Sequence, residues 1–158
     1  MQGSTSLATV FTFEQLRVLG ETDLGTSDWL RIGQERVNQF ADATEDHQWI
    51  HVDAQRAAEG PYGATIAHGY LTLSLVPRLL EDLLVITDKV RGTNYGLDRA
   101  RFTSPVPVGS DVRMHGRILH VTSRSDGGLQ YKVGVELHVR DQDRPALVAE
   151  AIYLVYAS

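Results

Sequence analysis

The chain has 158 residues, of which 42% are hydrophobic and 22% are charged, and its net charge is −5. This size and composition are typical of one globular domain with a sizeable core. No block of Lys or Arg stands out, so we expect no nucleic-acid partner. The absence of cysteine excludes disulfides and cysteine nucleophiles and agrees with a cytoplasmic protein.

The start of the chain is polar and lacks the basic and apolar regions of a secretory signal. We expect residues 1–10 to form a flexible tail and residues 11–158 to form a single domain. Thr12 and Gln15 make a capping-box pattern, which predicts a short helix that ends at Gly20.

The next segments read as helical and irregular. The sequence SDWLRI at residues 27–32 indicates a short strand, and the spacing of apolar residues in 34–44 predicts a helix. Residues 46–62 show no steady period and end in Gly-Pro, so we expect an ordered loop there.

Residues 67–84 give the strongest helical signal in the sequence. The segment is apolar on nearly every side, which is typical of a buried helix. Pro77 should bend it, because proline cannot donate a hydrogen bond to the carbonyl of Leu73. The longest apolar stretch, Gly69–Leu80, contains Pro77 and Arg78 and is too short to span a bilayer, so we expect no membrane association.

After residue 90 the sequence changes character and alternates apolar with polar residues. Four strands are predicted, over residues 93–103, 111–122, 130–140 and 146–156. Short connections indicate an antiparallel meander. The fold class is therefore α+β, with about five strands wrapped around a long central helix in the hot-dog arrangement. Exposed sheet edge and apolar surface favour a homodimer.

Asp46 and His51 carry the chemistry that we expect of this fold. On a helix, a spacing of five residues would turn the two side chains about 140° apart. They converge only if the chain turns between them, which fits the loss of helical period. A carboxylate and an imidazole that meet on a loop would bind one water, and histidine titrates near neutral pH.

His68 and Gly69 stand where the long helix should begin. The first amides of a helix have no partner within it, and glycine lets a ligand approach the backbone closely. A ligand carbonyl directed at the N–H of Gly69 would be polarised, and negative charge that develops on its oxygen would be stabilised.

These residues resemble the MaoC-like hydratase and dehydratase family. The pattern D-x4-H-x-D from Asp46, followed by I-A-H-G-x-L, is similar to the family motif. The segment FTSPVPVG at residues 102–109 resembles the strand that follows in the family. The sequence DHQWIH at residues 46–51 looks most like the nodulation protein N branch of this family. The resemblance covers the chain from about Ser27 to Tyr156.

The resemblance implies a hydro-lyase that interconverts trans-2-enoyl and (R)-3-hydroxyacyl thioesters. It assigns the water to Asp46 and His51, the carbonyl to the amide of Gly69, and a supporting role to Ser74. No metal or redox cofactor is implied, since coenzyme A or an acyl carrier would be part of the substrate. Where the family usually has Asn and Pro, this chain has Gln48 and Trp49, which affects the substrate more than the chemistry.

Several site residues also have a structural interpretation. Asp46 could cap a helix, and His51 could be a buried structural histidine. His68, which we include with the substrate-binding residues, could instead hold the loop through a backbone hydrogen bond. Trp49 and Tyr62 could line an acyl tunnel or pack in the core.

Gly69 could simply allow a close contact between helix and strand, and Asp53 is expected to cap a turn at residues 54–58. The spacing of His47 and His51 permits a metal site, although a non-helical segment disfavours it. Two other functions remain open, a thioesterase on the same fold and an acyl-thioester binder without activity.

Overall fold

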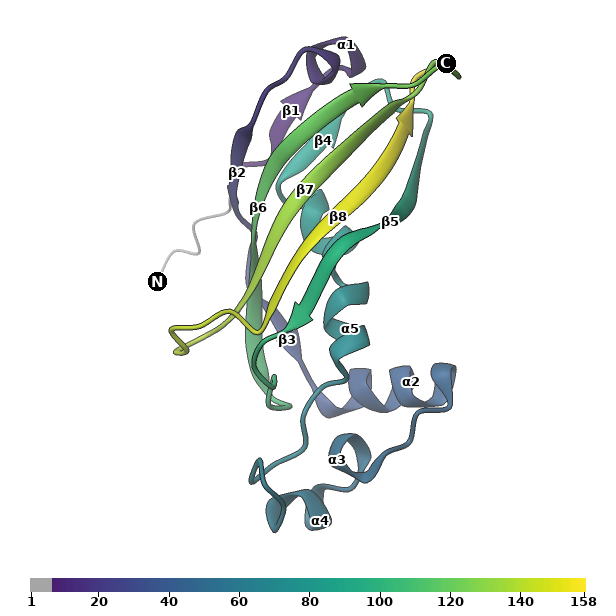
Figure 1. Ribbon diagram of the computed structural model, residues 1–158. Helices are drawn as coiled ribbons and strands as arrows, with labels where there is room; N and C mark the ends of the chain where they lie inside the picture. Colours follow the sequence, from purple (N-terminus) through teal and green to yellow (C-terminus); the bar gives the residue numbers. More distant parts are fainter. Residues whose placement is uncertain (1–6) are drawn as a thin grey trace.

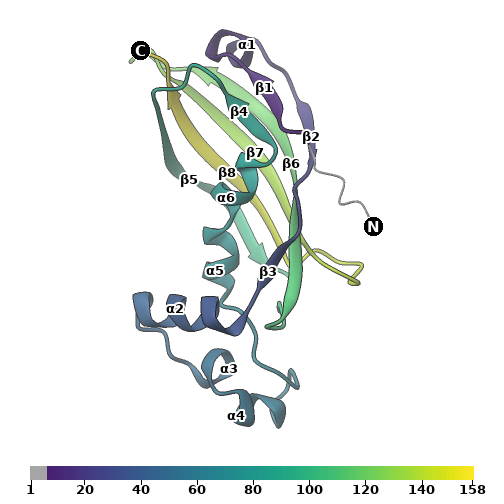
Figure 2. The same cartoon turned by 180° about the vertical axis from the view of Figure 1, so that it is seen from behind.

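The computed structural model describes residues 7–158 and contains a curved six-stranded antiparallel sheet. The helices of the central segment, α5 (Gly69–Ser74) and α6 (Val76–Glu81), lie on the concave side of this sheet (Figure 1). Figure 2 shows the same arrangement from behind. The neighbouring strands are, in order, β2 (Thr22–Thr26), β6 (Ser110–Ser123), β7 (Leu129–Val139), β8 (Leu147–Tyr156) and β5 (Arg91–Phe102). Strand β3 (Leu30–Ile32) pairs with the beginning of β6.

The long strands form because apolar residues alternate with polar ones and so build one buried face. Along β7, every second residue is buried and the residues between them are partly exposed. The inner face of β7 consists of Leu129, Tyr131, Val133, Val135, Leu137 and Val139. These side chains belong to the same core cluster as the apolar residues of the central helices. The predicted hot-dog fold is therefore confirmed.

The central segment differs from the prediction of one long helix. It forms two short helices, α5 (Gly69–Ser74) and α6 (Val76–Glu81), with the break at Leu75. The break lies next to Pro77, as expected from its missing N–H. One side of α5 faces outward, because the side chain of Tyr70 is 70% exposed.

The last residues of the predicted helix form a strand instead. Strand β4 (Leu84–Ile86) pairs in parallel with β1 (Thr9–Phe11). The prediction of a flexible tail over residues 1–10 is therefore wrong for Thr9 and Val10, and residues 1–6 lie outside the described part of the chain. A three-residue strand is too short to show a period, and its pairing depends on residues 75 positions away.

Helix α1 (Phe13–Arg17) begins with the predicted capping box. The hydroxyl oxygen of Thr12 accepts a hydrogen bond from the backbone N–H of Gln15. In return, the side-chain oxygen of Gln15 accepts one from the backbone N–H of Thr12. The predicted simple meander holds only for β6, β7 and β8. Strand β5 precedes them in the chain but pairs with β8, so it forms the opposite edge of the sheet from β2.

A helical overhang, residues 33–68, extends beyond the end of the sheet (Figure 1). It contains α2 (Gln34–Thr44), α3 (Trp49–Val52) and α4 (Ala54–Ala58). The predicted ordered loop over residues 46–62 is therefore wrong, because helices of four or five residues are too short to show a period. The expected cap at Asp53 is present at the start of α4, since the carboxylate of Asp53 accepts a hydrogen bond from the backbone N–H of Arg56. Within residues 7–158, no helix has the length and apolar character needed to cross a membrane.

Candidate active site

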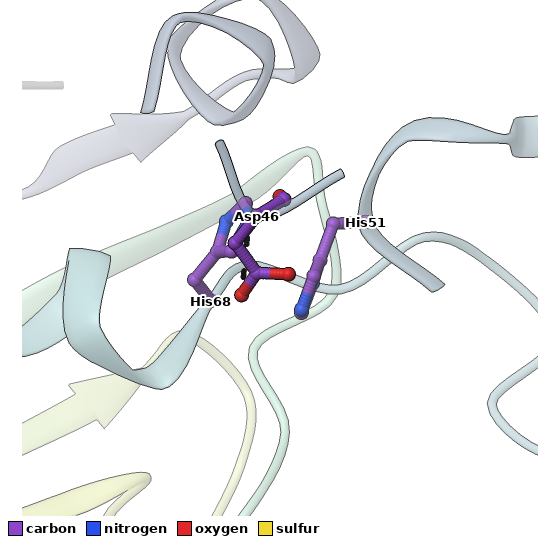
Figure 3. Close-up of side chains that lie close together, drawn as sticks. All are labelled: Asp46, His51 and His68. Carbon is purple, nitrogen blue, oxygen red and sulfur yellow. Dashed lines mark hydrogen bonds and ion pairs between the residues drawn. The ribbon is translucent and has the colours of Figure 1, made fainter. Parts of the chain in front are cut away.

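Asp46, His51 and His68 meet at the junction between the overhang and the central helices (Figure 3). Helix α2 ends at Thr44, and the following residue, Glu45, has a left-handed backbone (φ 61°) that turns the chain before Asp46. His51 lies in α3, and His68 precedes α5. Polar side-chain atoms of the three residues all lie within 4.8 Å of one another. The structure thus brings Asp46 and His51 together through a turn.

His51 is buried, with only 7% of its surface exposed, and its ring is held in one orientation. Its Nδ1 lies 2.6 Å from the carbonyl oxygen of Ile66, so Nδ1–H is the donor. The other ring nitrogen, Nε2, therefore carries a free lone pair. Burial lowers the pKa of His51, and the neighbouring His68 also lowers it, while the Ile66 carbonyl and Asp46 oppose the shift. The neutral form of His51, which can accept a proton, is favoured.

Asp46 is the exposed member of the group, with 53% of its side chain accessible. Its Oδ1 accepts one long hydrogen bond, 3.4 Å, from the backbone N–H of Gln48. The rest of the carboxylate is open to solvent or to a ligand. A carboxylate and a neutral imidazole side by side are able to hold a water molecule and remove a proton from it.

His68 is 2% exposed and contacts both of the other residues. Its Nε2–H donates to the backbone carbonyl of Asp46 at 2.9 Å, so the predicted backbone hydrogen bond of His68 is present. The ring stacks on His51 with centroids 3.8 Å apart and packs at an angle against Phe40. Of the three residues, His51 lines the adjoining cavity, whereas Asp46 and His68 do not.

The same three residues are also of metal-binding type, and their geometry tests that alternative. Metal ions lie near the plane of an imidazole ligand, about 2.0–2.1 Å from the nitrogen for zinc. The His51 and His68 rings are nearly parallel, at 23°, so their lone pairs run in separate, stacked planes. The arrangement suits proton transfer and fits a shared metal ion poorly.

A cavity of about 300 Å³ adjoins His51. Its other walls include Tyr62, Gly69, Thr72 and Phe102, so it lies between the overhang and the edge strand β5. Tyr62 is 50% exposed at this cavity. The backbone of Gly69 is approached closely by the Phe102 ring, since a Cβ at this position would lie 2.9 Å from the ring. Glycine thus permits the close contact with β5.

Two predicted site residues lie elsewhere. The hydroxyl of Ser74 donates to the carbonyl of Tyr70 at 2.6 Å. It borders a separate hollow of about 440 Å³ between the central helices and β5. Trp49 packs under the guanidinium of Arg56, 4.4 Å from the ring centre, and does not line the His51 cavity.

Two residues of the site were missed by the sequence analysis. The side-chain Nε2 of Gln34 donates a 2.7 Å hydrogen bond to the backbone carbonyl of His51. Its Oε1 accepts a hydrogen bond of the same length from the hydroxyl of Thr65. It thereby connects α2 to both segments of the site. Phe102 covers Gly69 from β5. Neither has a local signal, because a glutamine at a helix start and an aromatic residue in a strand are both ordinary.

Comparison with known proteins agrees with this fold. Residues 18–139 match the family described as MaoC like domain. The chain therefore belongs to the MaoC-like dehydratase domain family.

Individual relatives are similar over most of the chain. It is 47% identical to 3-hydroxyacyl-thioester dehydratase Z of Mycobacterium tuberculosis, over 89% of this chain and 95% of that protein. It is 43% identical to Nodulation protein N of Rhizobium leguminosarum bv. viciae, over 84% of each chain.

Two solved structures share the fold. The (R)-hydratase from A. caviae involved in PHA biosynthesis superposes with a TM-score of 0.69 at 23% identity, covering 87% of this chain and 97% of that chain. The MaoC-like dehydratase from Rhodospirillum rubrum gives a TM-score of 0.71 at 16% identity, covering 94% and 98%. At these identities the likeness concerns the fold.

Proposed function

We propose that this protein is a hydro-lyase that adds water to trans-2-enoyl thioesters to give (R)-3-hydroxyacyl thioesters, or removes it again. The similarity to a 3-hydroxyacyl-thioester dehydratase over 89% of the chain supports this reaction. The observation that carries the proposal is the free Nε2 of buried His51, next to the open carboxylate of Asp46. This pair provides a base and a second acceptor for one water molecule.

The reaction follows from these positions. A water between the two side chains gives one proton to Nε2 of His51 while its oxygen bonds to C3 of the enoyl group. Asp46 accepts a hydrogen bond from the second hydrogen and so orients the water. The protonated His51 then delivers its proton to C2 on the same face, which completes a syn addition. Dehydration is the reverse sequence.

The thioester oxygen gains negative charge as C3 is attacked. Gly69 is the first residue of α5, where an amide has no acceptor within the helix, and it lines the same cavity as His51. A hydrogen bond from this amide to the enolate oxygen would stabilise the transition state, and losing such a donor typically costs about 2.7–4 kcal/mol. No step requires a resident metal or redox cofactor, so we expect activity to persist in EDTA.

Substrate contacts are assigned from the surroundings of the cavity. Tyr62, at the cavity wall, would contact the acyl group, and Ser74 would contact a chain that extends into the neighbouring hollow. Trp49 would act only by supporting α4. Coenzyme A or an acyl carrier would be the handle of the substrate, and the cysteine-free sequence favours the cytoplasm.

We also propose a homodimer that joins two sheets along β5. This strand is an edge of the sheet, and nearly all of its residues are exposed. Exposed apolar side chains along it, those of Tyr95, Leu97 and Phe102, resemble an uncovered interface. Sedimentation velocity would give the mass of two chains, and a monomer at micromolar concentration would contradict the proposal.

The direct test is a spectrophotometric assay with crotonyl-CoA and with longer and branched enoyl thioesters. We expect loss of the enoyl thioester absorbance and an (R)-configured product. Release of free thiol from acyl-CoA without hydration would identify a thioesterase instead. Saturable binding without turnover of any enoyl thioester would identify a catalytically silent binding protein.

A further inference from the structure

The imidazole of His68 is the most completely buried polar ring next to the site, and one of its nitrogens is unused. Nε2–H donates to the carbonyl of Asp46, whereas Nδ1 is buried without a hydrogen-bond partner among the described residues. Because a carbonyl oxygen can only accept, the proton of this hydrogen bond lies on Nε2 of His68.

The hydrogen bond from His68 fixes the main chain of Asp46 and leaves its carboxylate free. Nε2 lies 2.9 Å from the backbone oxygen, but its closest approach to the carboxylate is 4.0 Å. Other support for Asp46 is weak, since its side chain is largely exposed and, among residues 7–158, accepts only the 3.4 Å hydrogen bond from the backbone N–H of Gln48. The position of this carboxylate thus depends on a residue that follows it by 22 positions.

His68 also covers the ring of His51. The two rings stack at 3.8 Å, and Ile66, two residues before His68, accepts the hydrogen bond from His51. The titratable groups that face His51 are Asp46 from the turn after α2 and His68 from the start of α5. Burial and the His68 ring both lower the pKa of His51.

We infer that His68 is a positioning residue for hydration, which places the Asp46 carboxylate beside His51 and covers the His51 ring by stacking on it. This inference rests on the proposed function. The contacts of His68 within the site are to the main chain of Asp46 and to the ring of His51, so it acts through these two residues.

Two substitutions of nearly equal size separate this role from simple core packing. The side-chain nitrogen of glutamine overlies Nε2 of histidine, whereas that of asparagine overlies Nδ1. His68→Gln can therefore still donate to the carbonyl of Asp46, and His68→Asn cannot. We expect His68→Asn to lower kcat by about 10- to 100-fold with little change in KM, as for a small displacement of a reacting group. His68→Gln should recover most of this loss.

The pH dependence supplies a second readout. Both substitutions uncover the His51 ring and remove the neighbouring imidazole, so the pKa of His51 should rise. The acid limb of kcat/KM should move to higher pH in both variants. His120→Phe, at an exposed histidine of β6, is the control that should leave kcat and the acid limb unchanged. Equal kcat in the Asn variant and the native protein, or an unmoved acid limb, would overturn the inference.

The tautomers themselves are measurable without substrate. Multiple-bond ¹H–¹⁵N spectra of the native protein should show the proton of His68 on Nε2 and that of His51 on Nδ1. Detection of His68 with its proton on Nδ1 would also overturn the inference. Failure of the proposed function has a different result, in which the native protein shows these tautomers and hydrates no enoyl thioester.

Discussion

The sheet and the overhang are stabilised by different interactions. The inner faces of β6, β7 and β8 are apolar and buried, and long antiparallel ladders connect these strands. The overhang contributes few buried apolar side chains, and individual polar bonds hold it in place, for example those of Gln34 and His68. Stability therefore resides mainly in the sheet, and the chemistry resides at the margin of the overhang.

The largest expected effect separates these two properties. Asp46→Asn keeps the shape of the side chain but removes its charge, and kcat should fall about 100-fold, because the water is held less firmly in its attacking position. Because the side chain is exposed, the free energy of unfolding should change little. Steady-state kinetics and urea unfolding on the same preparation measure both. Full activity in this variant would disprove the role assigned to Asp46.

The reverse result is expected for the sheet. Leu137 is completely buried on β7, and Leu137→Ala should lower the free energy of unfolding by about 2–5 kcal/mol. At a temperature where the variant stays folded, kcat per folded molecule should remain near the native value. A large loss of kcat in the folded variant would mean that the sheet and the site are coupled.

Gly69 lies where the two regions touch. In Gly69→Ala the new methyl group would lie 2.9 Å from the Phe102 ring, so the ring or the helix must shift. We expect a loss of about 1–3 kcal/mol in stability, together with reduced activity. The double variant Gly69→Ala with Phe102→Leu should recover stability, because leucine leaves more room. If the single variant is as stable as the native protein, the close contact is not important.

The smallest effect is the dependence of stability on pH. The pKa of His51 is lowered in the folded protein from its ordinary value of about 6.5, because of burial. The unfolded chain therefore binds the proton first, so this contribution to stability is complete above pH 6.5 and is lost as the pH falls. Urea unfolding at several pH values should show the loss, and His51→Phe should reduce it. An equal slope in both proteins would contradict this prediction.

Strands that are long and half-buried could be predicted from the sequence, because burial of one face imposes a period of two. The break at Pro77 and the cap at Asp53 could be predicted as well, since each depends on local backbone chemistry. The convergence of Asp46 and His51 followed from their spacing and the end of the helical period. Gly69 was correctly placed next to His51, although the contact with Phe102 was only a general possibility.

Other features depend on contacts between distant residues and had no local signal. The parallel pair of β1 and β4 is one example, and β2, whose sequence TDLGT has a single large apolar residue, is another. The helices α3 and α4 are too short to show a period. Gln34 could not be assigned, because its two partners come from positions 17 and 31 residues away.

The overhang departs from the sheet and returns to it at almost the same place. The carbonyl of Ile32, just before it, accepts from the N–H of Gly109 at 2.7 Å, and Ile66, near its end, bridges to Pro107. A short stretch of chain thus anchors both ends. Residues 33–65, which include Asp46 and His51, are therefore joined to the sheet at one place. Exchanging this segment between relatives should replace the reactive groups and leave the sheet of the recipient protein unchanged.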